Sequence, residues 1–121
     1  MKYLMMIYMD ERAFYALSDS ERQKVYDECG TVRERLIAQG KFLGGSRLQP
    51  TTAARSIRLR DGKELVTDGP FAETHEQLGG YALLDVDNVD EALAIARQSP
   101  LLKIGTLELR PLVEQAAEAS A

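Results

Sequence analysis

The chain has 121 residues, of which 45% are hydrophobic and 28% charged, a composition typical of one globular domain. A single cysteine excludes an internal disulfide, and with a single histidine it leaves no protein ligand set for zinc, so we expect no metal and no cofactor. The net charge of −4 argues against a nucleic-acid partner, and the longest apolar run, residues 3–9, is too short to cross a membrane, so we expect a cytoplasmic protein.

The first elements have clear local signals. Residues 3–8 are apolar on both faces of a two-residue repeat, which predicts a central strand covered on both sides. Residues 18–39 are predicted to form a helix. Ser18 and Glu21 have the spacing of a capping box at its start, and Gly40 ends it.

A second strand and a hairpin are expected next. The strand covers residues 42–48, and its glycine pair at 44–45 indicates a bulge or a close approach of two backbones. The hairpin has strands at 55–60 and 63–67, joined by an Asp-Gly turn at 61–62.

The last third of the chain repeats the strand–helix–strand order. Residues 80–86 predict another strand that is apolar on both faces. Asn88 is expected to cap a helix that ends before Pro100, and residues 104–110 alternate as a final strand. We expect residues 114–121 to be a loose tail.

The element order predicts a single α+β domain over residues 1–113: a ferredoxin-like split β-α-β sandwich with an inserted hairpin. Right-handed crossovers place both helices on one face of the sheet. Since the chain has no further element for the other face, we expect a homodimer formed by sheet-on-sheet packing.

Charge is distributed unevenly along the chain. Residues 41–63 hold six Lys or Arg against one Asp, a net charge of +5, and residues 64–91 hold eight carboxylates and no Lys or Arg. One interpretation is a solvated basic hairpin beside an acidic loop. The other is self-complementarity, in which the basic patch of one subunit faces the acidic patch of another.

The stretch from Asp68 to Tyr81 is the most distinctive in the sequence. It places a carboxylate, Asp68, in a turn stiffened by the following proline, with the only histidine, His75, seven positions later. A carboxylate beside an imidazole can act as an acid/base pair, so both are candidate catalytic residues. The structural alternatives are a turn residue for Asp68 and an exposed loop residue for His75.

Three further residues are candidates for ligand binding. Arg47, at the end of the second strand, could hold a small anionic ligand, or it could form a surface ion pair. Tyr8 and Tyr81 lie on the two central strands, where their hydroxyl groups could line a binding site. Cys29 is expected on the apolar stripe of the first helix, as a buried core residue.

The block from Asp68 to Glu73 (DGPFAE), followed by Glu76 to Tyr81 (EQLGGY), resembles the signature of the DGPF branch of the YCII-related family. The resemblance covers roughly residues 1–113. It implies a ferredoxin-like fold assembled as a dimeric α/β barrel, in a largely bacterial branch whose biochemical function is unassigned.

The resemblance also implies a His–Asp pair. Its aspartate corresponds to Asp68, but its histidine falls near Cys29, so the pair is not intact here. Two functions therefore remain: a dimeric ligand-binding or regulatory module, or a small-molecule enzyme of the lyase or isomerase type with Asp68 as its acid/base.

Overall fold

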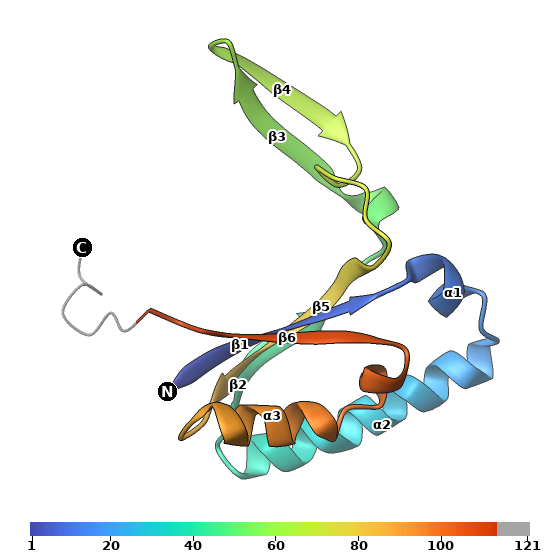
Figure 1. Cartoon of the computed structure of the whole chain (residues 1–121). Helices are drawn as coiled ribbons and strands as arrows, with labels where there is room; N and C mark the ends of the chain where they lie inside the picture. Colours follow the sequence, from blue (N-terminus) through green and yellow to red (C-terminus); the bar gives the residue numbers. More distant parts are fainter. Residues whose placement is uncertain (114–121) are drawn as a thin grey trace.

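The computed structural model describes residues 1–113, which form two sheets and two long helices (Figure 1). The elements are β1 (Lys2–Met9), α1 (Glu11–Tyr15), α2 (Asp19–Ala38), β2 (Phe42–Arg47), η1 (Thr51–Ala53), β3 (Arg55–Arg60), β4 (Lys63–Asp68), β5 (Gln77–Asp85), α3 (Val89–Arg97), η2 (Pro100–Lys103) and β6 (Gly105–Pro111). The expected tail, residues 114–121, lies outside the described residues.

The main sheet has four antiparallel strands in the order β2-β5-β1-β6. The two central strands, β5 and β1, are those whose sequences are apolar on both faces. Met5 lies opposite Ala82 of β5 on one side and Leu109 of β6 on the other. The expected mixed α+β fold is confirmed.

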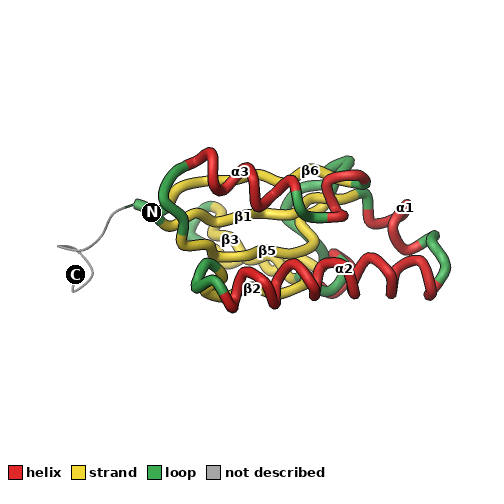
Figure 2. Tube along the Cα trace, turned by 90° about the horizontal axis from the view of Figure 1, so that it is seen from below, coloured by secondary structure: helices red, strands yellow, loops and turns green. Residues whose placement is uncertain are grey.

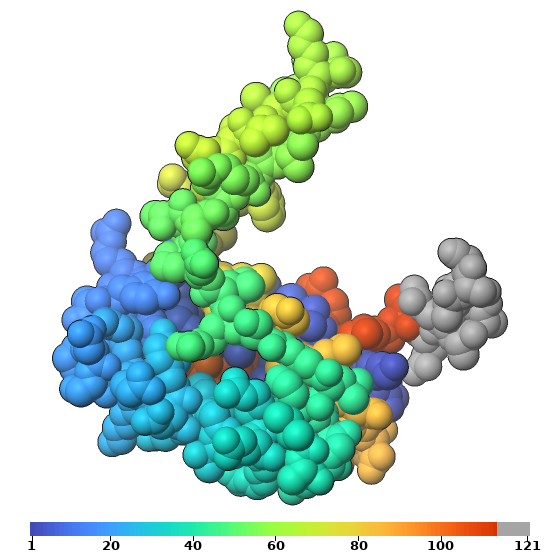
Figure 3. Space-filling model, turned by 180° about the vertical axis from the view of Figure 1, so that it is seen from behind, coloured from blue at the N-terminus to red at the C-terminus, as the bar shows by residue number. Residues whose placement is uncertain are grey.

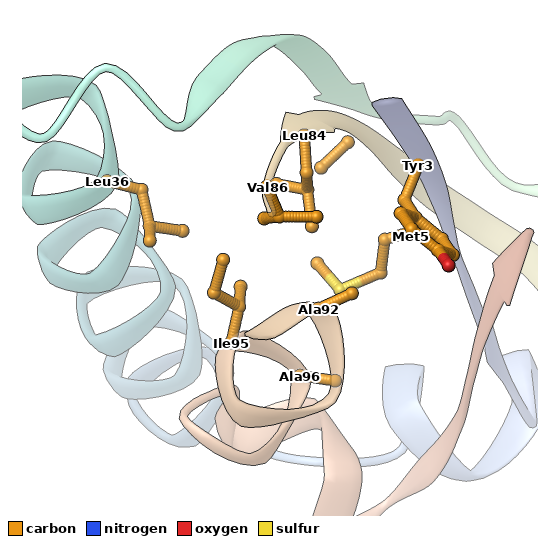
Figure 4. Close-up of a cluster of buried hydrophobic side chains, with 9 residues drawn as sticks. Tyr3, Met5, Leu36, Leu84, Val86, Ala92, Ile95 and Ala96 are labelled. Atoms are coloured by element: carbon orange, nitrogen blue, oxygen red, sulfur yellow. The ribbon is translucent and has the colours of Figure 1, made fainter. Parts of the chain in front are cut away.

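Helices α2 and α3 lie side by side on the same face of this sheet (Figures 1 and 2). Tyr3 and Met5 of β1 and Leu84 of β5 point from the sheet toward Leu36 of α2 and Ile95 of α3 (Figure 4). These side chains form the main core, in which Leu84 is fully buried. Neither long helix lies on the opposite face of the sheet.

Local sequence signals explain where the elements begin and end. Ser18 and Glu21 form both halves of the predicted capping box at the start of α2, and Gly40 follows the helix with a φ of +72°. Asp61 and Gly62 both have positive φ, as a two-residue hairpin turn requires.

Two features differ from the expectation. β5 begins at Gln77, three residues before the predicted start, because its pairing with β1 resumes at Leu78 and Gln77 on the other side of a bulge at Gly79. The two short 3-10 turns, η1 and η2, were not predicted, although Ser99 caps η2 and Pro100 begins it. Within residues 1–113, no helix is long and apolar enough to span a bilayer.

The hairpin β3–β4 forms a separate two-stranded sheet that projects from the body of the molecule (Figures 1 and 3). We call residues 55–68 the arm. The arm is attached at its root, where the Gly69 N–H donates to the Ala54 carbonyl at 2.8 Å.

Candidate functional site

A cavity of about 480 Å³ lies between α2 and the inner face of the main sheet. The space-filling view shows this side of the molecule hollowed between α2 and β2, below the root of the arm (Figure 3). Much of its wall is apolar, and includes Met5, Ile7, Met9, Phe14, Val32 and Leu36. A cavity of this size and character suits a small organic ligand.

Glycines of β5 help to leave this space open. A Cβ on Gly79 would lie 3.3 Å from the Met9 side chain, and one on Gly80 would lie 3.2 Å from the carbonyl oxygen of Ser46 and 3.6 Å from the Ile7 side chain. Met9 and Ile7 themselves line the cavity. Side chains at the two glycines would therefore take up room beside its wall.

Aromatic rings of α1 and α2 form one end of the cavity. The ring of Phe14 packs edge-on against those of Tyr15 and Tyr26, with centroids 5.4 and 5.8 Å apart. Burial raises the pKa of Tyr15, and Tyr26 and Glu11 raise it further, against the opposing effect of Arg22 and Arg47.

Arg47 supplies a positive charge at this end of the cavity. Its guanidinium carbon lies 3.9 Å from the centroid of the Tyr26 ring, which is a cation–π contact. No carboxylate of residues 1–113 forms an ion pair with Arg47. Arg47 is exposed, so its guanidinium group is accessible from solvent.

Three acidic residues line the cavity, Glu11, Asp27 and Glu34, and none of them forms an ion pair with Arg47. The Glu11 carboxylate accepts from the backbone N–H of Thr51 at 2.8 Å and from its hydroxyl at 2.7 Å. Asp27 accepts from the side-chain amide of Gln23 at 2.8 Å. Glu11 thereby joins α1 to the segment that leads into the arm. The positive charge of Arg47 is not paired with any of these three carboxylates.

Of the five residues proposed from the sequence, two line the cavity, but the side chain of Tyr81 lies on the outer face of the sheet, so its hydroxyl group is not part of the cavity. Arg47 and Tyr81 both line it. The register of Tyr81 opposite Met6 places its ring on the outer face of the sheet, where it is 41% exposed. Tyr8 does not line the cavity, and its hydroxyl lies 3.7 Å from the sulfur of Met6.

Asp68 and His75 lie apart from the cavity wall. Asp68 ends β4, its side chain is 87% exposed, and its carboxylate lies 3.0 Å from Nε of Arg55. The residue paired with this carboxylate is therefore Arg55, which lies opposite Asp68 in the hairpin. His75 lies in the exposed loop before β5, where its backbone carbonyl accepts from Gln77 at 3.3 Å.

Two residues of the cavity wall, Tyr26 and Cys29, differ from what the sequence indicated. Tyr26, whose ring stacks on Arg47, was not among the candidate site residues. Cys29 was expected to be buried, yet it is only half-buried, because the cavity opens beside it. The cavity exists because α2 and the main sheet are separated there. A sequence pattern does not reveal how far a helix lies from a sheet.

The Cys29 thiol is expected to react slowly in the native protein. Burial raises its pKa, the nearby Glu28 raises it further, and Arg33 and Arg47 oppose this effect. A raised pKa lowers the thiolate fraction at neutral pH, and the thiolate is the reactive form. Iodoacetamide alkylation at pH 7 should therefore be about tenfold slower in the native than in the unfolded protein. Equal rates would show that the thiol is free in solvent.

Two sequence comparisons find relatives of this chain. A family model described as the YCII-related domain matches residues 1–116. An uncharacterised protein of Rhizobium meliloti (strain 1021) is 40% identical over 114 residues, covering 93% of this chain and 92% of that protein.

A solved structure shares the fold. It is 5-chloro-2-hydroxyhydroquinone dehydrochlorinase from Burkholderia phenoliruptrix AC1100, in complex with 2,5-dihydroxybenzoquinone. The two chains superpose with a TM-score of 0.58 over 93% of each, at 13% sequence identity. This likeness extends to the fold alone.

Proposed function

The chain belongs to the YCII-related domain family, and from this premise we propose that it is a dimeric ligand-binding module whose cavity beneath α2 takes a small organic anion. The ligand has an apolar or aromatic body, which fills the space between α2 and the sheet, and one anionic group, which pairs with Arg47. A cytoplasmic location is part of the same proposal.

One observation carries the proposal: Arg47 is a cation without an ion-pair partner among residues 1–113, and it lies at the edge of an apolar cavity. A guanidinium stays charged at every physiological pH and donates to a carboxylate through two parallel hydrogen bonds. Stacking on Tyr26 holds it in one orientation before the ligand arrives. Apolar walls beside a fixed cation select molecules that have both an apolar body and a negative charge.

The dimer in this proposal is supported by the outer face of the sheet. Leu4, Met6 and Leu83 are apolar, only partly buried and adjacent in register on that face, with the partly exposed Tyr81 beside them. We propose that a second copy packs its own sheet there, giving a dimeric α/β barrel. The strand order β2-β5-β1-β6 supports a ferredoxin-like description of each subunit.

The second candidate is a lyase- or isomerase-type enzyme with Asp68 as its acid/base and His75 as its neighbour. The fold shared with a dehydrochlorinase favours it. The high exposure of Asp68, its ion pair with Arg55 and the cysteine at position 29 favour the binding module instead.

A titration of the isotope-labelled protein tests both candidates. Benzoate and benzyl alcohol have the same ring and nearly the same size, but only benzoate is an anion. We expect benzoate to shift the backbone amide resonances of Tyr26, Arg47 and Gly80, and to bind at least about tenfold more tightly than the alcohol.

Three other results of this titration would contradict the proposal or favour the second candidate. Equal binding of the two compounds would contradict the role of Arg47, and shifts confined to the outer face would contradict the cavity. Shifts centred on Asp68 and His75 would favour the enzyme.

A further inference from the structure

Gly30 is an unusual residue for the interior of a long helix. It lies in the middle of α2, where glycine is less favourable than alanine because it loses more backbone freedom on folding. Beyond its own turn of helix, a Cβ at this position would have only the Nη2 atom of Arg33 within 4 Å, at 3.8 Å, which is an ordinary contact. Packing within residues 1–113 therefore does not require a glycine here. Gly30 does line the cavity, where it leaves a stretch of bare helix backbone.

Two guanidinium groups lie beside this bare backbone. That of Arg47 stacks on the ring of Tyr26, which precedes Gly30 by four residues on α2. That of Arg33 reaches back toward Gly30, as its distance from the Cβ position shows. Residues four apart are neighbours on one side of a helix, so the two cations lie about one helical turn apart along α2. Both arginines line the cavity, and both are accessible from solvent.

Neither cation is neutralised by a nearby acid. No carboxylate of residues 1–113 forms an ion pair with Arg33 or Arg47. Asp27 and Glu34 also line the cavity, but with 3.6 residues per turn they lie roughly 80–100° around α2 from Tyr26. Arg33 lies within about 20° of Tyr26 by the same count. The stripe that holds the two cations is therefore separate from the stripe that holds the two acids.

The Cys29 thiol is influenced by both of these cations. Burial raises its pKa and Glu28 raises it further, whereas Arg33 and Arg47 both oppose the increase. The influence of a charge falls off over a short distance in a salt solution. Both guanidinium groups thus lie near the same residue of the cavity wall.

We propose that the ligand of this cavity is a dianion, with one anionic group on Arg47, a second on Arg33, and a body that crosses the bare backbone at Gly30. This inference rests on the proposed function and narrows its ligand class to aromatic or apolar dicarboxylates. Each guanidinium donates to a carboxylate through two parallel hydrogen bonds. Because the two cations lie on one side of α2, they suit carboxylates that leave the body of the ligand toward the same side.

Three aromatic acids test the proposal in calorimetric titrations of the whole chain at pH 7. Benzoate has one carboxylate, and isophthalate and terephthalate each have two. The two carboxylates of isophthalate are at ring positions 1 and 3 and can reach toward one side, whereas those of terephthalate point in opposite directions. We expect isophthalate to bind at least about tenfold more tightly than benzoate, and terephthalate to bind within about threefold of benzoate.

Matched variants assign the second carboxylate to Arg33. Arg33→Met should weaken isophthalate to about the affinity of benzoate and leave benzoate itself within about threefold of wild type. Lys24→Met removes an exposed cation of α2 that does not line the cavity, and it should leave both affinities unchanged. Gly30→Ala should raise the thermal midpoint by about 2–5 °C, because alanine is the better helix former, yet weaken isophthalate several-fold.

The outcomes separate this inference from the function beneath it. A protein that binds neither benzoate nor isophthalate would overturn the proposed function and the second anion contact together. Tight benzoate binding with no gain for isophthalate would overturn the second contact alone, as would equal gains for isophthalate and terephthalate. An isophthalate affinity that is unchanged in Arg33→Met would overturn the role of Arg33, and one that is unchanged in Gly30→Ala would overturn the placement of the ligand body.

Discussion

Replacing Gly45 by alanine is expected to lower the free energy of unfolding by about 2–4 kcal/mol. Gly45 lies in β2 where this strand meets β5, and its φ of +153° is rarely adopted by residues with a side chain. An added Cβ would collide with the carbonyl oxygen of Tyr81 and lie 2.9 Å from the Cα of Ala82. Backbone atoms cannot move aside, so β2 would have to separate from the sheet.

The neighbouring glycine provides the matched control. A Cβ on Gly44 would meet no atom within 4 Å, so Gly44→Ala should change stability by less than about 1 kcal/mol. Thermal unfolding of both variants by circular dichroism would give the comparison. A midpoint about 10 °C lower for Gly45→Ala alone is expected. Equal losses at the two positions would contradict the strand pairing described for β2.

Replacing Arg47 by methionine is expected to weaken benzoate binding by about 10- to 100-fold. Methionine keeps an unbranched stem that can pack on Tyr26, but it lacks the charge and the N–H donors. Since no carboxylate of residues 1–113 pairs with Arg47, its removal leaves no buried acid without a partner. The variant should therefore fold normally, and its loss of affinity would report on the anion contact.

Much of the fold could be predicted because its signals are local. The capping box of Ser18 and Glu21, the Asn88 cap and the Asp61-Gly62 turn each need only a few neighbouring residues, and the structure has all three. The two central strands could be recognised because each is apolar on both faces.

The site was harder to predict because it depends on separation in space. Arg47 was singled out as a candidate anion-binding residue, and the structure places it at the cavity wall, yet its stacking on Tyr26 joins residues 21 positions apart in the sequence. Asp68 and His75 attracted attention because they lie in the most distinctive motif, while the structure pairs Asp68 with Arg55 across the arm. A sequence motif marks residues that matter, and it does not say whether they face a cavity.

The measurement that tests the central claim most directly is a calorimetric titration of benzoate into the wild-type protein, Arg47→Met and the control Arg12→Met. Arg12 is an exposed cation of α1 that does not line the cavity. We predict that the wild type and Arg12→Met bind benzoate equally well and that Arg47→Met binds about 10- to 100-fold more weakly, with benzyl alcohol unaffected by either change. Equal benzoate affinity in all three proteins would contradict the assignment of the cavity as an anion-binding site.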